Sequence, residues 1–161
     1  MTDVFSAKKR SNLMSKIRAK DTKPEIRVRN ALNSLGFKHT LHAQNLPGKP
    51  DIVFANSKIA IQVRGCFWHG HTCIDGHTPK SRKGYWNNKL KDNMFRDRRN
   101  DRRLRKLGWK ILRVWECDCM SRVKLLSTMK RIILFLEKRG LSHASGKRFL
   151  TRSENHAETF F

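Results

Sequence analysis

The stretch that decides the fold is the loop Cys66-Phe-Trp-His-Gly-His-Thr-Cys73. Two thiols and two imidazoles within eight residues are typical of a metal site. Phe67 and Trp68 lie between the first thiol and the histidines, a position that favours aromatic rings only where they stack on something. The loop therefore predicts a metal that orders the chain, together with a pair of stacking rings.

The other cysteines indicate how this loop is anchored. A structural zinc ion takes four N or S ligands, usually from two parts of the chain. The spacing admits as ligands Cys66 and Cys73, one of Cys117 and Cys119, and one of His69, His71 and His77. Spacing alone does not choose the histidine. The alternative interpretation is a set of free buried cysteines with surface histidines.

Charge indicates the class of partner. The 161 residues, enough for one domain, carry a formal net charge of +23, which implies a polyanion and favours nucleic acid. We expect no membrane association, because no stretch approaches the ~18–20 apolar residues of a spanning helix. The N-terminal sequence lacks the apolar region of a secretory signal. We therefore expect a cytoplasmic protein with reduced thiols.

The charge is concentrated in two segments. Residues 1–30 carry nine Lys and Arg against three acidic residues, and residues 79–106 carry twelve against three. A solvated basic surface would explain the charge but not the aromatic loop beside the second segment. We expect a basic arm at 1–20, a globular domain at 21–139 and a polar, partly disordered tail at 140–161.

Apolar periodicity predicts one α/β domain with a central mixed sheet flanked by helices. Thr22 and Glu25 are typical of a helix-capping box, followed by a buried stripe and Gly36 as the end of the helix. Expected strands are 37–43, 51–54, 58–63 and 109–115, and expected helices are 6–19, 22–35, 86–107 and 122–138. The helical period predicts inward-facing stripes on the last three helices: Val28, Leu32 and Leu35; Trp86, Leu90, Met94, Asp97, Asp101, Leu104 and Leu107; and Leu125, Met129, Ile132, Ile133 and Leu136.

A carboxylate centre is the second candidate site. Asp51 opens one strand and Arg64 ends its neighbour, so a magnesium ion and a phosphate could lie side by side. A Pro-Asp pair is also common in turns. A histidine that zinc does not use, such as His69, would be a natural general base. Three acidic residues lie on apolar stripes, and each has a functional and a structural interpretation. Glu25 could belong to the active centre or only to the capping box, and Asp97 and Asp101 could be functional or only form salt bridges.

Several motifs in one order resemble a known family, the very-short-patch repair (Vsr) DNA mismatch endonucleases. They are Leu-Pro-Gly-Lys-Pro-Asp51, Gly-Cys66-Phe-Trp-His-Gly-His-Thr-Cys73, Tyr-Trp86, Arg-Asp97-Arg-Arg, Leu-Gly-Trp109 and Val-Trp-Glu-Cys117. The resemblance runs from about residue 8 to about residue 137. It implies the fold of type II restriction endonucleases with a structural zinc site, acting at the bacterial nucleoid.

The resemblance also implies an activity and a site. The family nicks double-stranded DNA on the 5′ side of the thymine in a T·G mismatch, the lesion left by deaminated 5-methylcytosine. Asp51 and the backbone of Val63 would bind Mg2+, and His69 would be the general base. The remaining implied roles are support of the active centre by Asp97 and Glu25, zinc ligation by Cys66, His71, Cys73 and Cys117, and DNA intercalation by Phe67, Trp68, Trp86 and Met14.

This chain departs from the family pattern at Arg64, where many members have histidine. An arginine cannot act as a base at neutral pH, so our hypothesis is that Arg64 clamps the phosphate. Two alternatives to mismatch nicking stay open: a zinc-stabilised nucleic-acid-binding protein without catalysis, and a nuclease of this fold with another DNA target. We expect a monomer, because one mismatch has no two-fold symmetry for a dimer to match.

Overall fold

The computed structural model describes residues 9, 12, 20–79 and 82–142. The expected basic arm, apart from those positions and Lys20, lies outside the described residues, as do Met14 and the tail from residue 143. The helices are α2 (Lys23–Ser34), α3 (Lys83–Lys106) and α4 (Arg122–Glu137); the strands are β1 (Thr40–Leu41), β2 (Ile52–Phe54), β3 (Ile59–Arg64) and β4 (Lys110–Trp115).

The four strands form one mixed sheet in the order β1-β2-β3-β4. The first three strands are antiparallel neighbours. β4 lies parallel to β3, in a register that runs from Ile59 opposite Lys110 to Arg64 opposite Trp115. A parallel pair needs a long crossover, which α3 provides. Because β3 and β4 end side by side, the loop that follows Arg64 and the cysteines that follow Trp115 meet at one edge.

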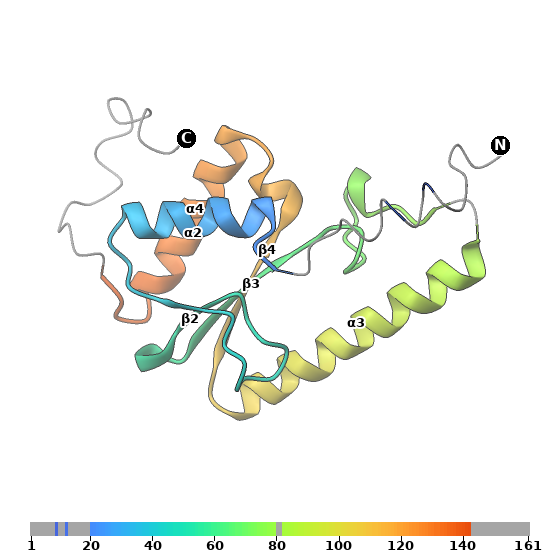
Figure 1. The fold of residues 1–161 in the computed structure, drawn as a ribbon. Coiled ribbons are helices and arrows are strands. Elements are labelled where there is room, and N and C mark those ends of the chain that lie inside the picture. The colour runs from blue at the N-terminus through green and yellow to red at the C-terminus, as the bar shows by residue number, and fades with distance from the viewer. Residues whose placement is uncertain (1–8, 10–11, 13–19, 80–81, 143–161) are drawn as a thin grey trace.

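Helices cover both faces of the sheet (Figure 1): α2 and α4 pack together on one face, and α3 runs along the other. The main core lies on the first face. Every residue of the predicted stripes on α2 and α4 is buried there: Val28, Leu32, Leu35, Leu125, Met129, Ile132, Ile133 and Leu136. The predicted α/β class with a central mixed sheet is therefore confirmed.

Alternation along β3 divides its side chains between the two faces. Ile59 and Ile61 join the main core, whereas Gln62 and Arg64 reach residues on the α3 side. The face toward α3 thus carries polar groups near the end of the strand. None of the described helices combines the length and the apolar character that crossing a membrane requires.

Two local expectations were wrong. The strand expected at 37–43 has only the residues of β1, because His42 adopts a φ of 48°, which breaks the extended backbone. On α3, Leu107 was expected to face inward but is 53% exposed, since the helix ends at Lys106. Asn93 on the same helix is buried because the loop that contains Trp68 covers it. The helical period alone does not predict this burial.

Candidate functional site

The centre of the site is Asp51, which follows Pro50 at the entrance to β2. Its Oδ2 atom accepts a hydrogen bond of 2.8 Å from the backbone N–H of Val63 on the adjacent strand. Burial raises the pKa of Asp51 to about 6; the Val63 N–H opposes this shift, and the nearby charge of Glu25 adds to it. A carboxylate held in this way has a strong tendency to take up a proton or a cation.

Glu25 lies beside Asp51, in the first turn of α2. It is 7% exposed, and its oxygens accept hydrogen bonds from the Thr22 hydroxyl (2.7 Å) and the Asp21 backbone N–H (2.9 Å). The predicted capping box is therefore wrong in its detail, because the Thr22 side chain donates to Glu25 and caps no backbone N–H. Ligand atoms of Glu25, Asp51 and His42 all lie within 4.8 Å of one another.

His69 and Asp97 form a pair at the same site. The Nδ1 atom of His69 shares a short hydrogen bond with Oδ2 of Asp97. Burial by itself would raise the pKa of Asp97, but the hydrogen bond with His69 and then the charges of His69 and Arg64 outweigh it, so the pKa lies below its usual value. Asp97 is therefore a charged acceptor that fixes the orientation of the imidazole.

Hydrogen bonds to buried side chains hold the Arg64 guanidinium in place. Its Nη2 atom donates to Gln62 (2.7 Å) and to Asp101 (2.9 Å), and Asp101 also accepts from Arg113 (2.6 Å). Asp101 is 1% exposed, so the salt-bridge interpretation of this residue is confirmed. Among the described residues, neither Nη1 nor Nε of Arg64 has a hydrogen-bond partner that would occupy it. Those donors remain for a ligand.

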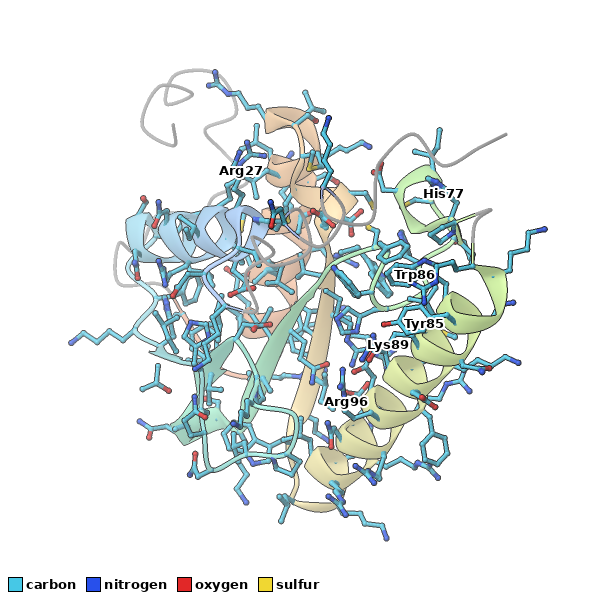
Figure 2. All side chains as sticks on the ribbon, turned by 45° about the vertical axis from the view of Figure 1, so that its right-hand side comes forward. Arg27, His77, Tyr85, Trp86, Lys89 and Arg96 are labelled. Atoms are coloured by element: carbon cyan, nitrogen blue, oxygen red, sulfur yellow. The ribbon has the colours of Figure 1, made fainter. Side chains whose placement is uncertain are left out.

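These groups line one open cavity of about 1170 Å³ between α2, the sheet and α3. Its acidic and imidazole groups are Asp21, Glu25, His42, Asp51, His69, Asp97 and Glu116, and its cationic groups are Lys20, Lys23, Lys49, Arg64 and Arg96. Figure 2 shows Trp86, Lys89 and Arg96 in succession along α3. An acidic centre with a cationic margin can attract a polyanion and hold a hard metal against it.

The predicted zinc cluster forms at the edge where β3 and β4 end. Ligand atoms of Cys66, His71, Cys73 and Cys117 lie within 4.8 Å of one another. Three thiols and one imidazole are a donor set that fits tetrahedral zinc. Cys119 instead lies in the hydrophobic core and is fully buried. The structure thus selects His71 and Cys117 from the alternatives that spacing left open.

Local contacts explain why the loop can fold around this cluster. The His71 ring stacks on Trp115, with ring centroids 4.2 Å apart and planes at 18°. Gly70 has a φ of 63°, and a Cβ atom there would lie 2.7 Å from the Met94 sulfur on α3. The positive φ favours glycine at this turn, and any larger residue would also displace the Met94 side chain. The turn places His69 toward the cavity and His71 toward the cysteines.

The three aromatic residues expected to meet DNA lie together. Phe67 contacts Trp68 (centroids 4.9 Å apart) and Trp86 (5.2 Å), all in edge-on or tilted arrangements. Trp86 is only 8% exposed, and the backbone carbonyl of Trp68 accepts a hydrogen bond from Asn93. In the free chain the rings therefore pack on one another, and Trp86 is their buried base.

Sequence reasoning missed His42, although the strand pattern contained a signal for it. The register of β1 and β2 pairs Leu41 with Ile52, so the next positions outward, His42 and Asp51, are opposite each other. The His42 N–H donates to the Asp51 carbonyl at 3.0 Å, as this register requires. An explicit pairing of the two strand sequences would have placed the imidazole beside the carboxylate.

Comparison with known proteins identifies the family of the chain. Residues 2–75 match the family model described as DNA mismatch endonuclease Vsr. The type II nicking enzyme V.XorIIP of Xanthomonas oryzae is 42% identical over 133 residues, covering 83% of this chain and 98% of the relative. The chain belongs to the Vsr DNA mismatch endonuclease family. It is a DNA strand-nicking endonuclease.

Two other relatives cover most of the chain. The type II nicking enzyme V.NmeAIP of Neisseria meningitidis is 41% identical over 133 residues, or 83% of this chain and 95% of its own length. The DNA mismatch endonuclease Vsr of Escherichia coli is 39% identical over 125 residues, or 78% of this chain and 80% of its own.

Proposed function

We propose that this nicking endonuclease cuts one strand of a DNA duplex on the 5′ side of the thymine in a T·G mismatch, in a Mg2+-dependent reaction. The observation that carries the proposal is the convergence of Asp51, the His69–Asp97 pair and Arg64 in one cavity with a cationic margin. Metal-assisted hydrolysis of a phosphodiester bond uses a metal-binding carboxylate, a general base and a cationic side chain, and candidates for all three line this cavity.

Oxygen donors make Asp51 and the backbone carbonyl of Val63 suitable for magnesium, and the thiols and imidazole of the other cluster suit zinc. Bound Mg2+ supplies Lewis-acid chemistry at a phosphate oxygen and at the attacking water. The zinc cluster contributes folding free energy, because it ties the loop after β3 to the end of β4.

His69 is the proposed general base. Its Nδ1 atom is engaged by Asp97, so Nε2 is the nitrogen that takes the proton from water. The charged Asp97 carboxylate holds the ring and stabilises the imidazolium that results, as a triad carboxylate does. The unoccupied N–H groups of Arg64 bind the scissile phosphate and offset its developing charge.

The aromatic cluster supplies the proposed selectivity for a mismatch. Phe67 and Trp68, which pack on the buried Trp86 ring, would insert beside the mispair. Insertion costs a few kcal/mol of base unstacking, and the cost is lower at a mispair because its stacking is already weakened. The rings must first separate from one another, which matched DNA would compensate less well. Met14 remains a predicted contact in the other groove. We expect the protein to act as a monomer, because one mismatch has no two-fold symmetry.

The test is single-turnover nicking of a duplex with one T·G pair, with and without Mg2+, beside the same duplex with T·A. In Mg2+, the wild type should nick only the thymine-containing strand of the T·G duplex, and Asp51→Ala should bind this duplex without nicking it. Loss of the mismatch preference would refute the target, whereas Mg2+-independent or absent nicking would refute the chemistry. Binding should also weaken steeply with salt, as phosphate contacts require.

A second candidate is nicking at another DNA target. Two of the three relatives described above favour it, since both are named type II nicking enzymes and neither name mentions a mismatch. Equal cutting of the matched duplex would support this candidate. Nucleic-acid binding without catalysis is set aside, because the chain belongs to a family of strand-nicking endonucleases.

A further inference from the structure

We propose that the α2 side of the carboxylate centre is a separate cation site, with Glu25, Asp51 and His42 as ligands and Asp21 as the residue that orients His42. The site would take a first-row transition-metal dication in preference to Mg2+. The inference rests on the proposed function, because it shares Asp51 with the proposed magnesium site. It adds a nitrogen ligand that the nicking chemistry described above does not use.

Distances support the ligand set. The three ligand atoms lie within 4.8 Å of one another, and they come from α2, from the residue after β1 and from the residue before β2. Three atoms each bonded at roughly 2.1 Å to one cation lie about 3.0–3.6 Å apart. Closure from the 4.8 Å limit therefore needs a movement of at most about 1–2 Å.

Charge also supports a cation. Glu25 is 7% exposed, and its charge lies close enough to the half-buried Asp51 to act on that carboxyl group. Among the ion pairs of the described residues, none joins a Lys or Arg side chain to either carboxylate. Paired carboxylates that lack a cationic partner are stabilised by a bound metal.

Asp21 fixes which nitrogen of His42 is available. Nε2 of His42 lies 3.4 Å from Oδ1 of Asp21, and Asp21 is itself held by Arg29 at 2.8 Å. A proton on Nε2 leaves the lone pair on Nδ1. This carboxylate–histidine arrangement is the usual support of a metal-ligating histidine. The long contact to Asp21 would shorten as the metal draws charge from the ring.

The imidazole determines the metal preference. Mg2+ favours an all-oxygen site and keeps several waters, whereas imidazole favours transition metals. Two carboxylates with one imidazole therefore bind Mn2+ or Co2+ more tightly than Mg2+. Toward Val63, the proposed magnesium ligands are the Asp51 carboxylate and the Val63 backbone carbonyl, which are both oxygen donors. The two sides of Asp51 thus differ in the metal that each prefers.

The experiment is a Mn2+ titration of the full-length zinc-loaded chain without DNA, read by electron paramagnetic resonance, with spin-echo detection of a coordinated ¹⁴N. Wild type should bind Mn2+ with a histidine ¹⁴N signal. His42→Gln should weaken Mn2+ binding at least about tenfold and abolish that signal, and His77→Gln, an exposed histidine away from the cavity, should change neither.

Asp21→Asn supplies a variant that folds, since Asp21 is half-exposed and asparagine tolerates its positive φ. It should weaken Mn2+ binding less than His42→Gln while keeping the ¹⁴N signal. Mn2+ bound without ¹⁴N in wild type, or equally by His42→Gln, would overturn the inference even if nicking is normal. Nicking that fails in every metal, with the ¹⁴N signal present, would refute the proposed function and leave this site standing.

Discussion

The Cys and His cluster and the carboxylate centre each gather side chains that can hold a metal, but they are built over different lengths of chain. Three residues of the first cluster come from one eight-residue loop, and only Cys117 is distant. The second joins a helix, the end of β1 and the start of β2. The first supplies three thiols and an imidazole, and the second supplies mainly oxygens in an open cavity.

The difference separates stability from chemistry. A tetrahedral zinc ion on four protein ligands would leave no place for substrate, so we expect the first cluster to stabilise the fold. The carboxylate centre has fewer ligands and an open approach, which substrate catalysis requires. Substitutions in the two clusters should therefore have different signatures.

The largest effect is expected at the zinc cluster. Cys117→Ser should lose most of the bound zinc and more than about 4 kcal/mol of stability, because zinc contributes to folding directly. The measurement is zinc content together with urea unfolding. Cys119→Ala is the matched control, since this thiol lies in the core and not in the cluster. Equal loss of zinc in both variants would show that the wrong cysteine has been assigned.

The His69–Asp97 pair should show the next largest effect. His69→Gln should lower the single-turnover nicking rate by about 10²–10⁴-fold with zinc content unchanged. Asp97→Asn should lower it less, and the double variant should be no slower than His69→Gln alone, because the two residues act as a unit. Multiplicative losses in the double variant would show that they act independently.

Arg64 tests whether a phosphate clamp is part of the open centre. Arg64→Gln should slow nicking by about 10²-fold. Arg113→Gln provides the control, because Arg113 also binds Asp101 but does not line the cavity. Unchanged nicking in Arg64→Gln would mean that Arg64 only neutralises Asp101.

The smallest effect concerns the stability cost of the open centre. The pKa of Asp51 is about 6 in the fold against 3.8 as a free side chain. A raised pKa contributes stability at low pH that is lost as the pH rises through the folded value, so Asp51→Asn should be the more stable form at neutral pH. Without Mg2+ the difference should reach about 3 kcal/mol above pH ~7 and about half that near pH ~5.

Urea unfolding of the zinc-loaded variants at these two pH values measures the difference. The zinc cluster is common to both variants, so its own pH dependence cancels. A difference that stays constant with pH would show that the Asp51 carboxylate is not destabilised by burial.

The sequence predicts the local parts of the molecule well. The stripe on α4 follows from its helical period, and the zinc cluster follows from the density of thiols and imidazoles in one loop. The choice of His71 over His69 and His77 as zinc ligand depends on the turn at Gly70. The presence of glycine at this position does not by itself predict that turn. The family resemblance supplied that choice before the structure did.

Non-local polar contacts are what the sequence could not supply. The ion pair of Asp101 with Arg64 spans 37 residues and depends on the angle of α3 against β3. His42 differs, because it lies opposite Asp51 in the register of β1 and β2, and pairing the two strand sequences would have indicated it. The Asp101 contact is set by the assembled helix and sheet, and a helical or strand period by itself does not predict it.

We propose that the zinc cluster stabilises the fold while the Asp51 carboxylate serves the nicking reaction. This proposal is tested most directly by measuring zinc content, DNA binding and Mg2+-dependent nicking of Asp51→Asn on one T·G duplex. We predict wild-type zinc content, DNA affinity within about threefold of wild type, and a nicking rate at least about 10³-fold lower. Nicking near the wild-type rate, with zinc and binding intact, would contradict the account.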